Sequence, residues 1–238
     1  MGSYESPWMD DELAIFRSSV RRFVGEEFVP NEKRWREQHH IDREAWAAAG
    51  DVGILLTDVP EEYGGGSGTF AHECVVMEEL SYAGVTSFGH VVQSIVAHYL
   101  VAYGTDEQKQ EWLPAMAQGR TVAALAMTEP DAGSDVQSIR TTAIRQGEHV
   151  VSGSKNFITN GYHADLICLA TKTDATQNGV HGISLIMIET KNLQGYRVGR
   201  CWTKSVSADK TPVNCSSMTC VCPQRTFSEQ KKEKGLLK

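Results

Sequence analysis

Apolar side chains recur at helical spacing over the first part of the chain. Four of them near the N-terminus lie three or four residues apart: Leu13, Phe16, Val20 and Phe23. This period places them on one face of a helix, which we expect to end at Pro30 because proline lacks a backbone N–H. Further helices are predicted over residues 42–50, 70–83 and 87–103, and another from Thr105. The sequence therefore predicts an all-α domain over residues 1–120.

After Gly119 the pattern changes to short runs of β-branched and apolar residues. These runs span residues 121–127, 141–145, 149–152, 165–171 and 182–189. Turn-forming pairs such as Gln146-Gly147 separate them, as expected between strands. No intervening segment has the length of a crossover helix, so we expect hairpins in an antiparallel sheet or barrel. We predict an α+β fold in which a small β-domain occupies residues 121–200.

Composition and charge argue for a soluble globular protein and against a nucleic-acid-binding or membrane-spanning one. The 238 residues are 41% hydrophobic and 22% charged, as in soluble globular proteins. A net charge of -7 argues against a nucleic-acid partner, which would require a basic face. No apolar run approaches the roughly 20 residues that span a bilayer, and the N-terminus carries acids where a targeting peptide carries bases. We therefore expect an intracellular, cytoplasmic protein without a membrane span.

The cysteines fall into two groups. Cys74 and Cys168 lie inside apolar runs and are predicted to be buried thiols. The other four crowd the segment after residue 200: Cys201, Cys215, Cys220 and Cys222. Their spacing, without accompanying histidines, fits no standard zinc site. We predict no metal site.

Two segments carry the candidate chemistry. In Ala126-Met-Thr-Glu-Pro-Asp-Ala-Gly-Ser-Asp135, an apolar run breaks into turn-forming residues. Gly133, Ser134 and Asp135 offer backbone N–H groups and a hydroxyl at one point, which is how a loop holds a phosphate. The second segment is Lys155-Asn-Phe-Ile-Thr-Asn-Gly161. Taken alone, an ordinary turn and an ordinary strand would also account for the two segments.

In order and spacing, the two segments together resemble the motifs of the acyl-CoA dehydrogenases. Pro60-Glu-Glu-Tyr-Gly-Gly65 and the segment 104–113 are similar to the same family. The resemblance implies that the β-domain holds FAD between the two segments. It also implies α,β-dehydrogenation of a fatty acyl-CoA to a trans-2-enoyl-CoA, as in fatty acid β-oxidation, with electrons passing to an electron-transfer flavoprotein. Family members are typically tetramers.

The resemblance assigns cofactor contacts to these residues: Leu125, Met127, Thr128, Gly133, Ser134, Phe157, Ile158 and Thr159. Gly133 and Ser134 would meet the pyrophosphate, and Ser134 would also touch the acyl-CoA substrate. Phe157 would pack on the flavin ring and Thr159 would hydrogen-bond near N5. The alternative places Phe157 and Ile158 in a strand core. Glu129 is interpreted as structural, and no catalytic residue is assigned.

The resemblance stops after Arg200. Residues 201–238 have no hydrophobic period, which is typical of a disordered tail. Suppose that the codons of residues 201–238 are read one base earlier, so that the last base of each codon joins the first two bases of the next. The genetic code then permits an amino-acid string that resembles the family's next segment. This pattern indicates a frame shift after Arg200. We expect the chain to lack the C-terminal helical bundle that carries the family's glutamate base, to hold FAD weakly, to have little activity and to be doubtful as an oligomer.

Three rival hypotheses remain at this point. The chain could be a non-catalytic flavin- or acyl-CoA-binding fragment, or an inert, unfolded product of a damaged gene. A flavin monooxygenase or nitroalkane oxidase could use the same scaffold, because the residues that separate those chemistries lie mostly in the expected missing part.

Overall fold

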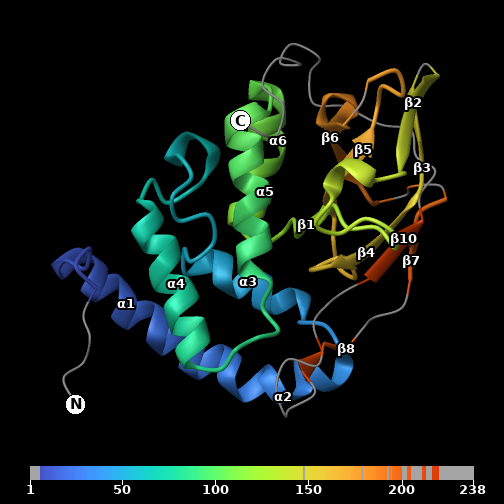
Figure 1. Ribbon diagram of the computed structural model, residues 1–238. Coiled ribbons are helices and arrows are strands. Elements are labelled where there is room, and N and C mark those ends of the chain that lie inside the picture. Colours follow the sequence, from blue (N-terminus) through green and yellow to red (C-terminus); the bar gives the residue numbers. More distant parts are fainter. Residues whose placement is uncertain are drawn as a thin grey trace.

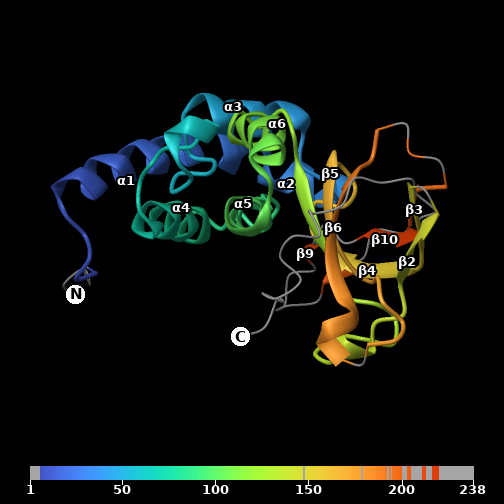
Figure 2. The same ribbon diagram turned by 90° about the horizontal axis from the view of Figure 1, so that it is seen from above.

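The computed structural model describes residues 6–146, 148–177, 179–191, 193, 195–199, 203–204, 211–212 and 216–219. A helical part comes first and comprises α1 (Asp11–Phe23), η1 (Val24–Phe28), α2 (Val29–Gln38), α3 (Arg43–Asp51), η2 (Glu61–Tyr63), α4 (Phe70–Tyr82), α5 (His90–Tyr103) and α6 (Asp106–Ala117). The strands follow and lie beside α5 and α6 (Figures 1 and 2).

The strands and short 3-10 turns of the second part are β1 (Ala123–Ala126), η3 (Val136–Ser138), β2 (Thr142–Gln146), β3 (Glu148–Ser152), β4 (Ser154–Ile158), β5 (Leu166–Lys172), η4 (Gly179–Gly182), β6 (Ile183–Glu189), β7 (Arg197–Val198), β8 (Thr203–Lys204), β9 (Thr211–Pro212) and β10 (Ser216–Thr219). The prediction of a helical domain followed by a small sheet domain is confirmed.

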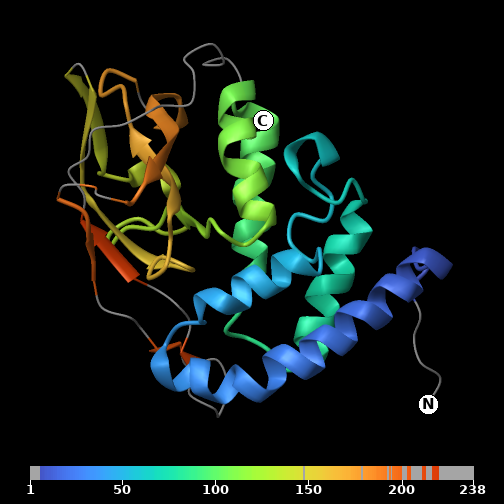
Figure 3. The same cartoon turned by 180° about the vertical axis from the view of Figure 1, so that it is seen from behind.

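The first helix does not end at Pro30. α1 passes through the π-helical turn η1 into α2, and Pro30 lies in the first turn of α2. Figure 3 shows the three segments following one another along one side of the molecule. A proline at the first turn of a helix gives up no helical hydrogen bond. The π turn therefore lets the helical course continue, and the prediction that the helix ends at Pro30 is wrong.

The sheet is mixed rather than antiparallel. β1 and β2 both pair with β5 in parallel, whereas β2 with β3 and β5 with β6 are antiparallel. Parallel strands need a long return connection, which is usually a helix. Here the chain between β1 and β5 contains β2, β3 and β4, so strands supply the connection. The antiparallel expectation is corrected on this point.

One hydrophobic core joins the two parts of the chain. It combines helical side chains such as Trp46 and Leu100 with Leu166, Cys168 and Met187 from β5 and β6. A second cluster lies within the strand region and includes Ala124, Ala126 and Ile158. The sheet therefore packs one face against the helices, and β1 has neighbours on both faces.

Part of the segment predicted to be a disordered tail forms a strand of a second, three-stranded sheet. β10 is antiparallel to both β4 and β7. The four cysteines after residue 200 lie outside the described residues. Cys168 is fully buried, which raises the pKa of its thiol to about 12. Cys74 is only partly buried, so the prediction of a buried thiol is confirmed for Cys168 but not for Cys74.

No described helix is long and apolar enough to cross a membrane. Within the described ranges, no group of three or more His, Cys, Asp or Glu side chains could hold a metal ion.

Candidate functional site

The first candidate segment leaves β1 as a tight turn. Glu129 and Ala132 exchange backbone hydrogen bonds of 2.8 and 3.2 Å, which places Pro130 and Asp131 at the tip. Gly133 and Ser134 follow and are exposed. A Cβ added at Gly133 would meet no atom within 4 Å, and its backbone does not have the positive φ that favours glycine. The chain itself therefore does not require glycine here, and the space beside the loop is open.

Lys155 in β4 ties the second candidate segment to the first. Its side chain is 1% exposed, and Nζ donates to Glu129 Oε1 at 2.8 Å and to the Met127 carbonyl at 2.9 Å. The backbone N–H of Asn156 donates to the Thr128 carbonyl at 2.8 Å. These bonds place the edge formed by Met127 and Thr128 directly against β4.

Glu129 is fixed in the same network. Its carboxylate also accepts hydrogen bonds from the backbone N–H groups of Arg140 and Thr141. Burial alone raises the pKa of Glu129, but hydrogen bonds from Lys155, Thr141 and the Arg140 backbone outweigh it and leave that pKa below its ordinary value. Burial lowers the pKa of Lys155, and Glu129 opposes this shift. The geometry agrees with a structural role for Glu129.

Two positive φ angles shape the end of β4. Phe157 has φ 58° and Asn160 has φ 64°. Asparagine tolerates this region, whereas a bulky aromatic residue there is strained. The Phe157 side chain is 53% exposed despite its size. Strained residues of this kind are found mostly at functional sites, so the exposed ring is the strongest candidate for a contact surface.

The structure separates some of the predicted cofactor residues. The Ile158 side chain is 1% exposed and lies in the strand-region core. Leu125 packs against the other core, which the sheet shares with the helices. These two side chains lie in different cores and do not converge on one ligand. Thr159 is partly buried. Met127 and Thr128 do lie beside the Phe157 strand, and the Gly133–Ser134 loop follows them along the chain.

Sequence reasoning missed Lys155, Asn160 and Gln93. Lys155 could have been found as a lysine inside an apolar strand, paired with the acid of the other segment. Asn160 donates to the carbonyls of Gly89 and Ala123 at 2.9 and 3.1 Å. Gln93 has no local signal, because its partners lie more than twenty residues away in the sequence.

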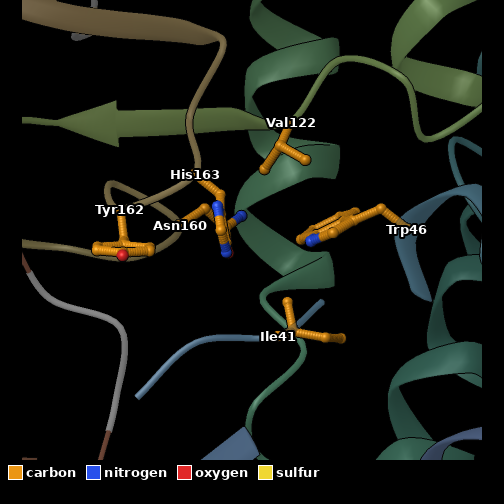
Figure 4. Close-up of a pocket in the computed structure, with 6 residues that line it drawn as sticks. All are labelled: Ile41, Trp46, Val122, Asn160, Tyr162 and His163. Carbon is orange, nitrogen blue, oxygen red and sulfur yellow. The ribbon is translucent and has the colours of Figure 1, made fainter. Parts of the chain in front are cut away.

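A narrow cavity lies where α3 meets the loop between β4 and β5 (Figure 4). Its lining residues are Ile41, Trp46, Val122, Asn160, Tyr162 and His163. Among the described residues, the Trp46 Nε1, Asn160 Oδ1 and His163 Nε2 atoms are buried without a hydrogen-bond partner. The cavity has no room for a water molecule. It is therefore a packing feature between the helices and the sheet rather than a substrate site.

His163 contributes a pH dependence at this junction. Burial, the neighbouring His40 and Arg43 lower the pKa of His163 from 6.5 to about 4, and Asp165 and Asp42 oppose the shift. His163 is thus protonated near pH 6.5 in the unfolded chain, but only near pH 4 in the folded chain. Stability should fall as pH drops through this window and level off below it.

His163→Gln is expected to reduce that fall in stability. Because the ring is partly exposed, solvent screening limits the expected difference to about 1 kcal/mol. Urea unfolding at several pH values between 7 and 4 would measure it. His181→Gln is a matched control, because it makes the same exchange at an exposed histidine and leaves this junction unchanged. Parallel curves for His163→Gln and the parent would contradict the assignment.

Comparison with known proteins agrees with this geometry. The acyl-CoA dehydrogenase N-terminal domain matches residues 10–120 and the acyl-CoA dehydrogenase middle domain matches residues 124–217. The second match extends past residue 200, where the tail was expected to begin. The mouse (Mus musculus) mitochondrial long-chain specific acyl-CoA dehydrogenase is 40% identical over 79% of this chain and 44% of its own length.

Solved structures show the same relationship. An acyl-CoA dehydrogenase from Geobacillus kaustophilus superposes with a TM-score of 0.85 at 37% identity, covering 92% of this chain and 58% of that one. A glutaryl-CoA dehydrogenase from Mycobacterium smegmatis, in complex with FADH2, has a TM-score of 0.78 at 27% identity, covering 93% and 57%. The chain thus spans about half the length of these relatives. It belongs to the acyl-CoA dehydrogenase family.

Proposed function

We propose that this chain carries the flavin-binding half of an FAD-dependent acyl-CoA dehydrogenase site. The observation that carries the proposal is the pairing of an open loop with an exposed, strained aromatic residue. Lys155 holds the Met127–Thr128 edge against the strand that presents Phe157, while the Gly133–Ser134 loop leaves its outer side open. A relative bound to FADH2 shares this fold.

The residues present fit a flavin dinucleotide. Phe157 offers an exposed ring on which a planar group can stack. The Thr128 hydroxyl can reach the polar edge of such a group, and Thr159 can hydrogen-bond near its N5 atom. The backbone N–H of Gly133 and the Ser134 hydroxyl are suited to a pyrophosphate. Bound FAD would supply the hydride acceptor for oxidation of the substrate.

The proposed substrate class is the fatty acyl-CoA thioesters, which Ser134 would also contact. A long-chain enzyme among the relatives supports this class. An electron-transfer flavoprotein is the proposed electron acceptor. Removal of the α-proton needs a base within hydrogen-bond reach of the α-carbon. Glu129 cannot serve, because Lys155 and two backbone N–H groups hold its carboxylate.

We therefore propose that the 238-residue chain has little dehydrogenase activity by itself. With FAD and palmitoyl-CoA added to purified protein, we expect no bleaching of the flavin absorbance and no reduction of an artificial electron acceptor. A full-length relative from this family is the positive control. Turnover by the chain, with stoichiometric yellow flavin in the purified protein, would contradict both the low activity and the weak cofactor binding.

A second candidate function is that of a flavin-binding module without catalysis. The locked carboxylate of Glu129 favours it, because Lys155 holds this buried acid and it is not available as a base. Flavin bound without substrate-driven bleaching would support this alternative over a complete enzyme.

A further inference from the structure

Helix α5 carries polar residues on its inner face. His90, Gln93 and Ser94 are buried, whereas Val91 and Tyr103 on the other face are 46% and 37% exposed. Helices normally turn their apolar side inward. A buried polar side chain lowers stability unless it is hydrogen-bonded, so these residues need specific partners. The partners of Gln93 are the informative ones.

Gln93 hydrogen-bonds the start of β1 and the chain just before it. Its side chain is fully buried, and Nε2 donates to the carbonyls of Met116 and Thr121 at 3.2 and 2.9 Å. Its Oε1 accepts from the Ala123 N–H at 2.7 Å. Both N–H donors of the amide and its carbonyl are therefore used. One side chain thus fixes the end of α6 and the first residue of β1 to α5.

Asn160 hydrogen-bonds the carbonyl side of Ala123, whose N–H is bonded by Gln93. Its Nδ2 donates to the Ala123 carbonyl at 3.1 Å and to the Gly89 carbonyl, just before α5, at 2.9 Å. A Cβ at Gly89 would lie 1.9 Å from Asn160 Oδ1, so the approach is close. Both backbone groups of Ala123 are thereby bonded to side-chain amides. These two amides connect β1 to the helical part.

We propose that Gln93 and Asn160 are positioning residues for the cofactor edge. β1 has only four residues and runs directly into Met127 and Thr128. A short strand transmits a displacement at one end to the other. The two amides therefore act from α5 on the position of Thr128 relative to Phe157, in addition to the bonds from Lys155 and the Asn156 N–H. This inference rests on the proposed flavin site, and small misplacements in such sites have large effects on binding and catalysis.

Gln93→Met keeps the length of the side chain but removes its hydrogen bonds to β1. The matched control is Ser94→Ala, which also removes a buried hydrogen bond from α5, but one made to Glu73 at 2.8 Å and not to β1. Titration of FAD should give a dissociation constant about 10-fold higher for Gln93→Met and unchanged for Ser94→Ala. The proposal would be overturned if Gln93→Met bound FAD as tightly as the parent chain. It would also be overturned if both variants lost affinity by the same factor.

Two further measurements separate positioning from a general loss of stability. A protonated carboxyl keeps the acceptor and one of the two donors of the Gln93 amide. Gln93→Glu should therefore regain part of the parent FAD affinity as pH is lowered, whereas Gln93→Met should not. Amide hydrogen exchange over residues 123–128 should be faster in Gln93→Met than in Ser94→Ala without any flavin. If the parent binds no FAD, the cofactor proposal fails, and equal exchange rates would then overturn the positioning role separately.

Discussion

Lys155→Met is expected to lower the free energy of unfolding by about 3–5 kcal/mol, because it leaves the Glu129 carboxylate buried and without its counter-ion. The two side chains are 1% and 5% exposed, and their charged atoms lie 2.8 Å apart. The lysine bond to the Met127 carbonyl would be lost as well. Urea unfolding at pH 7 would measure the change.

A double-mutant cycle provides the control for this prediction. The combination of Lys155→Met with Glu129→Gln removes both charges, and should be less damaging than the sum of the single changes. A loss below about 1 kcal/mol for Lys155→Met, the range of surface pairs, would show that the pair is not a buried ionic contact. Additive effects in the cycle would contradict direct coupling.

Gly119→Ala is the second large effect, expected to reduce stability by roughly 3 kcal/mol or more. Gly119 has φ +66°, and an added Cβ would lie 1.9 Å from the Trp46 carbonyl oxygen. The change therefore combines a strained backbone with a clash against the backbone of α3. Because α6 leads into β1 through this residue, the packing of α3 against α6 should be disturbed as well.

Gly53→Ala separates the two causes. Gly53 has φ +70°, but an added Cβ would meet nothing within 4 Å. Only the backbone cost of about 1–2 kcal/mol should appear there. Thermal and urea unfolding of both variants would test this expectation. Equal losses at the two positions would show that the close approach of Gly119 to Trp46 is not important for stability.

Local signals in the sequence predicted α3 to α6, but they missed α2, because Pro30 predicts the end of a helix. The helix predicted from Thr105 begins with a capping box, in which Thr105 and Gln108 make reciprocal bonds of 2.9 and 3.3 Å. α3 begins after Asp42 as predicted, but no side-chain cap forms. Instead, the Asp42 carboxylate accepts from Arg34, Trp35 and Gln38. A residue type can therefore mark a helix start while tertiary partners decide which bond its side chain makes.

Long-range pairing was beyond the reach of the sequence pattern. β1 and β5 are continuous apolar runs, which predict buried strands but do not reveal that the two strands run parallel. The same limit applies to the site. The motifs gave Thr128 and Phe157 as candidates, and these lie on adjacent segments of the fold. Ile158, from the same motif, lies in the strand-region core. Gln93 could not be recognised without the fold.

FAD titration, followed by the quenching of flavin fluorescence, tests the central claim most directly. The parent chain should show weak but saturable binding, and Phe157→Ala should weaken it by about 1–3 kcal/mol, the range for stacking on an aromatic side chain. Ile144→Ala is the control, since Ile144 is similarly exposed at 57% on β2. No saturable binding, or equal affinities for the parent, Phe157→Ala and Ile144→Ala, would contradict a flavin site beside Phe157.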